Sequence, residues 1–260
     1  MQRIYADYHT HTRHSHGQGT VEDNVRAAID AGLHTVAISD HGPANLFGVG
    51  VRNLGVFQAI RQEIESCQSK FPQIKLLLGV EANIIGIDGT LDIPPEALGQ
   101  FDLILAGLHP LVYPADLISG LAMVGNLMGR HWQYLSNRLR PWNTKAVISA
   151  LTRYPIDILT HPGLHMNIDT EKVASVCAQV GTYMEINTSH DHISADYLQI
   201  AFRAGTRFVI SSDAHTPSRV GDAAKGLKLA RLAKIPCFAI RNTASRQETW
   251  PRMEKRYEND

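Results

Sequence analysis

The sequence has little cysteine, no net charge and no long apolar run, and each shortage excludes a class of protein. Its three cysteines lie far apart and lack CxxC spacing, so we expect reduced thiols and neither a zinc ribbon nor a disulfide framework. Lys plus Arg and Asp plus Glu both number 25, so no broad electrostatic field attracts nucleic acid or a membrane surface. A small-molecule substrate is therefore the better expectation.

Two stretches argue against a secreted or membrane protein. Residues 1–9 (MQRIYADYH) have no basic start followed by the apolar core of a signal peptide. The most apolar stretch, residues 117–129 (LISGLAMVGNLMG), is too short and too interrupted by glycine to span a bilayer. We expect a cytoplasmic protein with no membrane partner, and the sequence leaves its oligomeric state open.

Short runs rich in Val, Ile and Leu alternate with helix-like segments, a pattern typical of parallel strands joined by crossover helices. The expected strands are 3–8, 34–39, 75–80, 102–108, 156–160, 182–187 and 206–211. Helices are expected at 20–33, 53–69, 170–179, 194–204 and 222–233. Because 260 residues suit one large core, the sequence predicts a single α/β domain of barrel type.

Two segments fall outside this alternation. Residues 115–152 are expected to form a longer helical insertion that Pro141 breaks into two pieces. This insertion covers the mouth of the barrel or forms a subunit interface, and the sequence does not decide between the two. The barrel domain is expected to span 1–240, followed by a polar C-terminal helix or tail at 241–260.

Four imidazoles crowd into residues 7–16, which read DYHTHTRHSH. Histidine is the commonest nitrogen ligand for transition metals, and alternate residues of a strand point to the same side. His9 and His11 are therefore candidates to bind one ion. A surface cluster that arises by composition is the alternative interpretation.

Metal-capable residues lie at the end of every expected strand. In chain order they are His9 and His11, Asp40 and His41, Glu81, His109, His161, Glu185 and Asn187, and Asp213 and His215. The carboxyl ends of the strands of a parallel barrel open on one face, where catalytic residues gather. One such histidine is usually a core or capping residue, but seven coincidences at one structural position predict a shared site.

These residues resemble the polymerase and histidinol phosphatase (PHP) family, whose hallmark is an N-terminal HxH, then a DHG, a lone Glu, a His-Pro pair and a DxH. The matching segments are DYHTHTRHSHG, AISDHGP, GVEANIIGIDG, ILAGLHP, THPG, MEINTS and SSDAH, in family order. They cover most of the chain and look most like the stand-alone phosphatase branch. The resemblance implies a distorted seven-stranded (β/α)7 TIM-like barrel.

The resemblance also implies three metal ions and their ligands. His9, His11, Glu81 and Asp213 would surround a first ion, and Glu81 would bridge to another. The remaining implied ligands are His16, His41 and His215 for a second ion, and His109 and His161, with Glu81, for a third. Seven imidazoles and two carboxylates without thiolates suit zinc, manganese or iron rather than magnesium or calcium.

The other histidines are expected to have lesser roles. His14 is a rival to His16 for the second ion, and we choose His16 because SHG matches the family element. His34 lies at the opposite end of its strand, and His131 is expected on the surface. His165 and His192 are either surface residues or substrate contacts near the mouth, and His190 is placed in a loop.

The implied reaction is hydrolysis of small phosphorylated metabolites, phosphate monoesters, by a water that bridges metal ions. Asp213 would also orient the water, and His215 would protonate the leaving alcohol. The candidate substrate-binding residues are Arg13, Arg52, Arg219 and Asn187. For each arginine a surface role is the alternative, and Asn187 and Glu185 are expected to support the ligands.

Three other functions are considered. A metal-dependent amidohydrolase normally has a carbamylated lysine at a strand end, and no lysine lies at such a position here. A nuclease or phosphodiesterase acting on nucleic acid ends is disfavoured by the balanced charge and the lack of basic runs. A metal-bearing scaffold without activity would be expected to have lost ligands.

Overall fold

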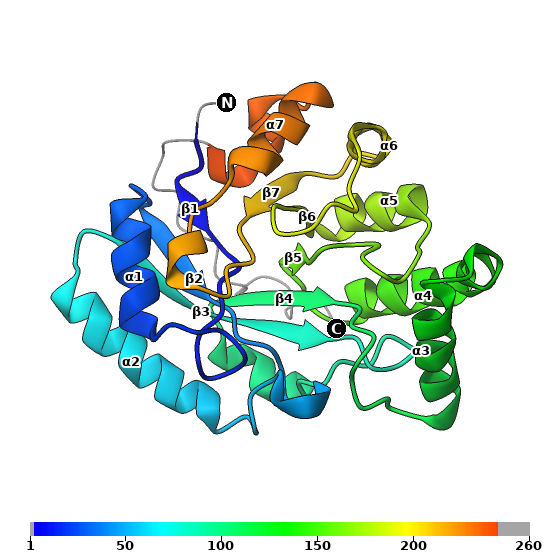
Figure 1. The fold of residues 1–260 in the computed structure, drawn as a ribbon, viewed down its shortest axis with the longest axis horizontal. Helices are drawn as coiled ribbons and strands as arrows, with labels where there is room; N and C mark the ends of the chain where they lie inside the picture. The colour runs from blue at the N-terminus through cyan, green and yellow to red at the C-terminus, as the bar shows by residue number, and fades with distance from the viewer. Residues whose placement is uncertain (1–2, 244–260) are drawn as a thin grey trace.

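A computed structural model describes residues 3–243 and contains seven parallel strands, each hydrogen-bonded to the next in chain order (Figure 1). The strands are β1 (Ala6–Asp7), β2 (Thr35–Ile38), β3 (Lys75–Asn83), β4 (Leu103–Gly107), β5 (Ile158–Leu159), β6 (Tyr183–Asn187) and β7 (Phe208–Ser211). All seven strands predicted from the sequence are present, and they form the predicted single-domain (β/α)7 TIM-like barrel.

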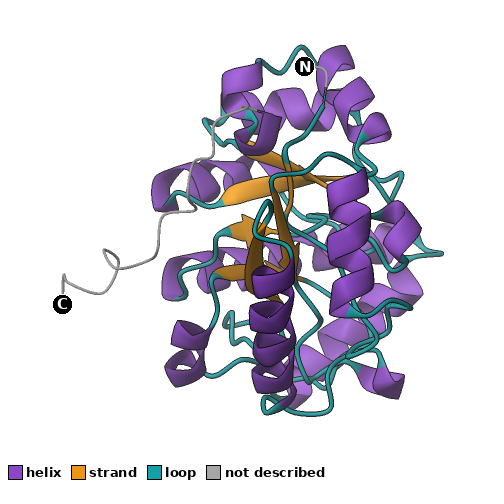
Figure 2. Ribbon diagram, turned by 90° about the vertical axis from the view of Figure 1, so that its left-hand side faces the viewer, coloured by secondary structure: helices purple, strands orange, loops and turns teal. Residues whose placement is uncertain are grey.

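Helices flank the strands on the outside of this barrel, as Figure 2 shows. They are α1 (Val21–Asp30), α2 (Val56–Lys70), α3 (Leu117–Gly129), α4 (Gln133–Arg153), α5 (Thr170–Val180), α6 (Ala195–Arg203) and α7 (Ala224–Leu232). Short 3₁₀ turns are η1 (Leu46–Gly48), η2 (Pro95–Gln100), η3 (Pro217–Arg219), η4 (Cys237–Ala239) and η5 (Arg241–Thr243). Within residues 3–243, no helix combines the length and the apolar character needed to cross a membrane.

The first helix shows how local sequence produces this architecture. Thr20 caps α1 by accepting a hydrogen bond from the Asp23 backbone, and the Asp23 carboxylate accepts one from the Thr20 backbone in return. Val21, Val25 and Ala28 follow at helical spacing and are fully buried against the sheet. Burial of each valine contributes about 1.5–3 kcal/mol.

The helical insertion breaks at a different place from the one predicted. Its two helices meet at residues 130–132, and Pro141 lies inside α4 rather than between them. Gly129 packs against the backbone of Ser136, where an added Cβ would lie 3.2 Å from the Ser136 nitrogen. Close packing of α3 on α4 therefore sets the corner. Pro141 is exposed, and α4 continues through it despite the lost backbone donor.

Eight apolar side chains fill the barrel interior, with strand alternation deciding which residues point inward. They are Ala6, Tyr8, Ala37, Leu77, Leu103, Leu105, Ile158 and Val209. In an extended chain, side chains four residues apart point to the same side. His41 follows Ala37 at this spacing, and Glu81 follows Leu77. His109 follows Leu105 in the same way, so these three residues belong to a polar layer above the apolar interior, and Asp213 joins the layer from the turn after β7.

Side chains complete the junction between β1 and β7. An isolated parallel bridge pairs Thr10 with Ala214 at the upper end. Below it, the Asn242 amide nitrogen donates to the Ala6 and Ile210 carbonyls, both at 2.7 Å, and its oxygen accepts from the Ile210 nitrogen at 3.1 Å. Residues 241–243 therefore contact the barrel, while residues 244–260 of the expected tail lie outside the described part.

Candidate metal centre

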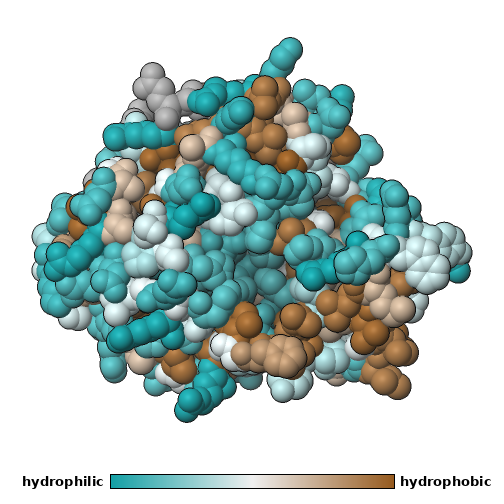
Figure 3. Space-filling view, viewed as in Figure 1, coloured by the Kyte–Doolittle hydropathy of each residue, from teal (hydrophilic) through white to brown (hydrophobic). Residues whose placement is uncertain are grey.

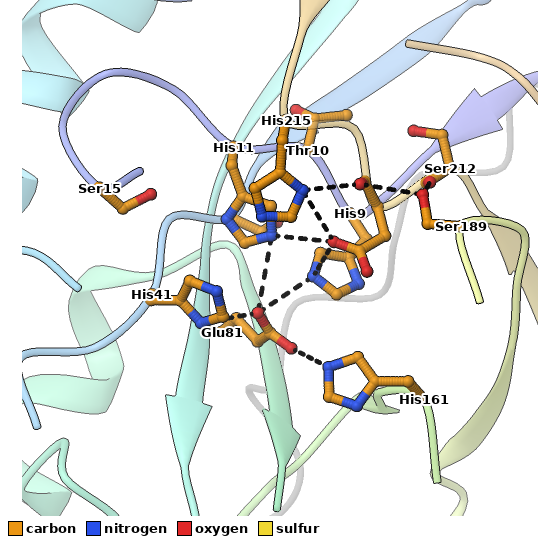
Figure 4. A network of polar contacts seen from close by, with 12 residues as sticks. His9, Thr10, His11, Ser15, His41, Glu81, His161, Ser189, Ser212 and His215 are labelled. Atoms are coloured by element: carbon orange, nitrogen blue, oxygen red, sulfur yellow. Dashed lines mark hydrogen bonds and ion pairs between the residues drawn. The ribbon is translucent and has the colours of Figure 1, made fainter. Parts of the chain in front are cut away.

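The Glu81 carboxylate lies at the centre of a buried cluster of imidazoles (Figure 4). Its Oε2 atom is 2.9 Å from His41 Nδ1 and 3.2 Å from His9 Nε2. The Nε2 atom of His11 is 3.6 Å from the same oxygen. The N-terminal HxH and the DHG histidine therefore surround one oxygen of Glu81.

The other oxygen of Glu81 faces a different pair of histidines. Its Oε1 atom is 2.8 Å from His161 Nε2 and 3.2 Å from His109 Nε2. The two histidine Nε2 atoms are themselves 3.2 Å apart. Each oxygen of one carboxylate thus belongs to its own group of nitrogen atoms, the arrangement of a bridging ligand.

Asp213 adds a second carboxylate beside the HxH pair. Its Oδ1 atom is 3.2 Å from His11 Nε2 and 3.6 Å from His9 Nε2. Its φ of 51° is rare for a residue other than glycine and commonly occurs at functional sites. The Oδ2 atom faces the other way, 3.0 Å from Asn187 Nδ2 and 3.3 Å from His190 Nε2.

His16 joins this cluster and His14 does not. The His16 ring centroid is 4.1 Å from that of His215 and 5.0 Å from that of His41. His14 instead places its Nε2 atom 2.8 Å from a carboxylate oxygen of Glu63 on α2. The geometry therefore places His16, as chosen from the sequence, on the side of the candidate ligands.

The donor atoms form three overlapping groups whose members lie within 4.8 Å of one another. The groups are His9, His11 and Asp213; His11, His41 and His215; and His41, Glu81 and His109. His9 Nε2, His41 Nδ1 and His215 Nε2 are buried and make no contact of hydrogen-bond geometry, although the first two lie within 3.2 Å of Glu81 Oε2. Buried polar atoms are normally paired, so convergent unpaired nitrogens and carboxylates fit divalent transition-metal ions.

Glu185 supports the cluster from β6. Its Oε1 atom is 2.7 Å from His9 Nδ1, and its Oε2 atom accepts a 2.7 Å hydrogen bond from the His161 backbone nitrogen. Asn187 donates to Glu185 Oε2 and to Asp213 Oδ2, both at 3.0 Å. Glu185 thus turns the Nε2 atom of His9 toward Glu81, the usual arrangement for a ligating histidine.

Asp40 orders the loop that leads to His16 and makes no contact with the imidazoles. Its carboxylate accepts hydrogen bonds from the Thr12 backbone at 2.8 Å and from the Thr12 hydroxyl at 2.6 Å. Burial raises the pKa of Asp40, while hydrogen bonds from Ser15 and Thr12 act in the opposite direction. This loop geometry brings His16 back over the barrel.

The two central carboxylates are strongly stabilised as anions. Burial alone would raise the pKa of Glu81, but the charges of His9 and His41 outweigh it and hold that pKa well below its usual value. Burial likewise opposes ionisation of Asp213, whose pKa His9 and His11 nevertheless hold well below its usual value. Both side chains are therefore available as ligands across the neutral pH range.

Burial and neighbouring imidazoles keep several histidines neutral. Burial, followed by the charge of His215, lowers the pKa of His16 to about 4. Burial also lowers the pKa of His109 to about 4, against the opposing charge of Glu81. A neutral imidazole keeps a lone pair for a metal, so both side chains have the protonation state that ligation needs.

The predicted substrate-binding arginines are not among the residues that meet at this cluster. Arg13, Arg52 and Arg219 are exposed. The Arg219 guanidinium lies 3.4 Å from an Asp222 carboxylate oxygen. No described contact joins the three arginines to the clustered histidines, so their role stays a prediction. Asn187, the fourth predicted residue, lies inside the site and binds its carboxylates.

His190 is a site residue that sequence reasoning missed. His190 contacts Asp213, and its ring centroid lies 6.1 Å from that of His161 and 6.3 Å from that of His192. His190 lies three residues after the end of β6, as His41 lies three residues after the end of β2, so its position after a strand was the signal that could have identified it. His34 packs against Tyr5 at a ring separation of 5.3 Å, at the other end of β2 as predicted.

The fold and the cluster define a TIM-like barrel protein with a histidine-rich group of candidate metal ligands at the carboxyl ends of its strands. The model of the PHP domain family matches residues 7–189, and the chain belongs to this family. A probable phosphatase from Thermoanaerobacter sp. (strain X514) is 30% identical over 252 residues, covering 93% of this chain and 91% of the relative. A probable phosphatase from Shewanella oneidensis is 29% identical over 241 residues, covering 88% and 84%.

Solved structures share the fold at low sequence identity. Histidinol phosphate phosphatase from Lactococcus lactis, complexed with zinc, L-histidinol and phosphate, has a TM-score of 0.63 at 18% identity, covering 88% of this chain and 94% of that one. A putative histidinol phosphatase from Listeria monocytogenes has a TM-score of 0.64 at 16% identity, covering 83% and 97%.

Proposed function

We propose that this PHP-domain protein is a metal-dependent phosphatase that hydrolyses small phosphate monoesters with three divalent transition-metal ions. The proposal rests on one observation: the two carboxylate oxygens of Glu81 face two different groups of imidazoles. Two cations that share a carboxylate are typical of sites that hydrolyse phosphate esters. Curated relatives named probable phosphatases support the same class of reaction.

The ligand sets follow the contacts already described. His9, His11, Glu81 and Asp213 would hold one ion, because the Nε2 atoms of both histidines lie 3.2 to 3.6 Å from an oxygen of each carboxylate. The other proposed ligands are His16, His41 and His215 for a second ion, and Glu81, His109 and His161 for a third. Zinc, manganese and iron all suit these donors.

Cations held there would lower the pKa of water and withdraw charge from the phosphoryl oxygens. Asp213 is fixed for a positioning role, since Asn187 and His190 hold its Oδ2 atom while Oδ1 faces the HxH pair. His215 Nδ1 lies 3.0 Å from the Asp213 carbonyl oxygen, so Nδ1 donates there and Nε2 keeps its lone pair. That tautomer favours ligation by His215 over its predicted role as proton donor to the leaving alcohol.

A small phosphorylated metabolite is the proposed substrate. The Lactococcus lactis structure, which shares this fold, contains phosphate and a small alcohol together with zinc. The equal numbers of acidic and basic residues give no general attraction for nucleic acid, which disfavours the nuclease alternative. No described lysine joins the clustered ligands, so nothing in the site favours an amidohydrolase.

The test combines metal analysis with hydrolysis. We expect purified protein to contain bound transition metal and to release phosphate from p-nitrophenyl phosphate, and complete chelation to abolish that release. His9→Ala and Asp213→Ala should each lose at least about 100-fold in kcat/KM together with bound metal, whereas His131→Ala, an exposed control, should retain both. Full activity after chelation, or preferential cleavage of an oligonucleotide over the monoester, would contradict the proposal.

A further inference from the structure

The outward face of α3 is wholly apolar. Its exposed residues are Leu117, Ile118, Leu121, Val124 and Met128, whose exposed fractions lie between 55% and 79%. Exposed leucines occur singly on most proteins, but five large apolar side chains on one helix form a continuous surface. Figure 3 shows hydrophobic side chains gathered at the lower right, where Figure 1 places α3.

The polar residues of α3 point inward, so the helix is amphipathic in the opposite sense from a normal surface helix. Ser119 and Asn126 are almost completely buried. The Ser119 hydroxyl accepts a hydrogen bond from the Ile87 nitrogen at 3.1 Å. The side chains of Asn126 and Asn143 exchange two hydrogen bonds of 2.8 Å between α3 and α4.

These buried hydrogen bonds fix the rotation of α3. Rotating α3 about its axis to bury its leucines would break the Asn126–Asn143 hydrogen bonds and leave both side-chain amides without these partners. An unsatisfied buried polar group costs about 1–3 kcal/mol, so the rotation is opposed. The apolar face is therefore a permanent feature of the surface of a single chain.

We propose that this α3 face is the contact between two copies of the chain, which meet through a two-fold axis. A two-fold contact places the same surface on both partners, and residues 117–129 contain no charged residue that would repel its counterpart. The whole chain has a formal net charge of zero, so long-range repulsion between copies is also small. A charged partner finds no complementary group on this face.

The size of the face also suits a dimer. Five exposed aliphatic side chains, with Trp132 and Tyr134 that follow α3 in the chain, can supply on the order of 800 Å², the usual area per partner of a stable interface. Exposed Trp and Tyr are enriched in such contacts. A membrane-surface helix would instead carry basic residues along its own length.

The oligomeric state of the purified protein tests this inference independently of metal content and activity. Sedimentation velocity over a concentration series should show a dimer for the wild type. Leu121→Glu should weaken dimerisation by at least about 100-fold, because two like charges would meet in an apolar contact. Leu232→Glu on α7 is the matched control, since Leu232 is 62% exposed and Leu121 is 66% exposed, and this variant should remain dimeric.

Circular dichroism and thermal unfolding establish that both variants fold. A wild type that stays monomeric at the highest concentration, or a folded Leu121→Glu variant with unchanged self-association, would overturn the inference. Co-sedimentation of a monomeric wild type with phosphatidylcholine–phosphatidylserine vesicles, abolished by Leu121→Glu, would assign the face to a lipid surface and overturn it equally.

Discussion

Single residues with two contacts decide how the candidate centre is held together. Glu185 touches no other carboxylate of the cluster but binds the His9 ring and the His161 backbone at 2.7 Å each. Glu185→Gln keeps the shape and removes the charge, so we expect metal affinity to fall about 10- to 100-fold. Competition with a chromophoric chelator measures that affinity, and the exposed Glu171→Gln variant on α5 is the control.

Replacing His16 or His14, two histidines of the N-terminal loop, should have very different effects on bound metal. His16→Ala removes an imidazole that lies among His41 and His215, so we expect loss of about one equivalent of metal and a fall in kcat/KM of at least about 100-fold. His14→Ala removes only a partly exposed contact to Glu63, worth about 1 kcal/mol or less. Equal metal loss in both variants would show that the assignment of His16 is mistaken.

Much of the centre could be predicted at this scale because strand alternation is regular. Ligand candidates recur four residues after the interior residues of β2, β3 and β4. His161 and Asp213 depart from this extended geometry: their φ values of 27° and 51° turn the chain just after β5 and β7, which no residue pattern signalled. Sequence reasoning missed His190 because its place in the site depends on a contact with Asp213, which is distant in sequence.

At the scale of elements, the α3–α4 hairpin depends on one buried amide pair. Asn126→Ala removes both hydrogen bonds between the two amides and leaves Asn143 Oδ1 without its donor, although Asn143 Nδ2 still donates to the Asn167 carbonyl. We expect the free energy of unfolding to fall by about 2 kcal/mol. Urea unfolding measures the change. Replacing both asparagines with leucine should restore part of the loss, since no amide then stays unsatisfied at that contact; a double variant weaker than the sum of the singles would contradict this.

The same hairpin shows where local rules end. Proline correctly marks many helix ends, yet Pro141 lies on an exposed turn of α4, where the rest of the helix keeps its hydrogen bonds and packing. The corner at 130–132 depends instead on Gly129 meeting Ser136, a contact between two helices. A reading of the sequence alone has no access to such contacts.

At the scale of the whole molecule, the junction between β1 and β7 concentrates stability in one side chain. Asn242 makes three hydrogen bonds to the two strands and is almost completely buried. Asn242→Ala should lower the free energy of unfolding by about 3 kcal/mol, because the backbone groups of both strands lose partners. Asn137→Ala, an exposed substitution on α4, should change it little in the same thermal and urea measurements.

The position of Asn242 also orders events during protein synthesis. Strands β1 to β7 all precede residue 242 in the chain, so every strand is synthesised before the side chain that joins β1 to β7. His9 and His11 come from one side of the seam and Asp213 from the other. The earliest and latest parts of the polypeptide must therefore meet before a complete metal site exists.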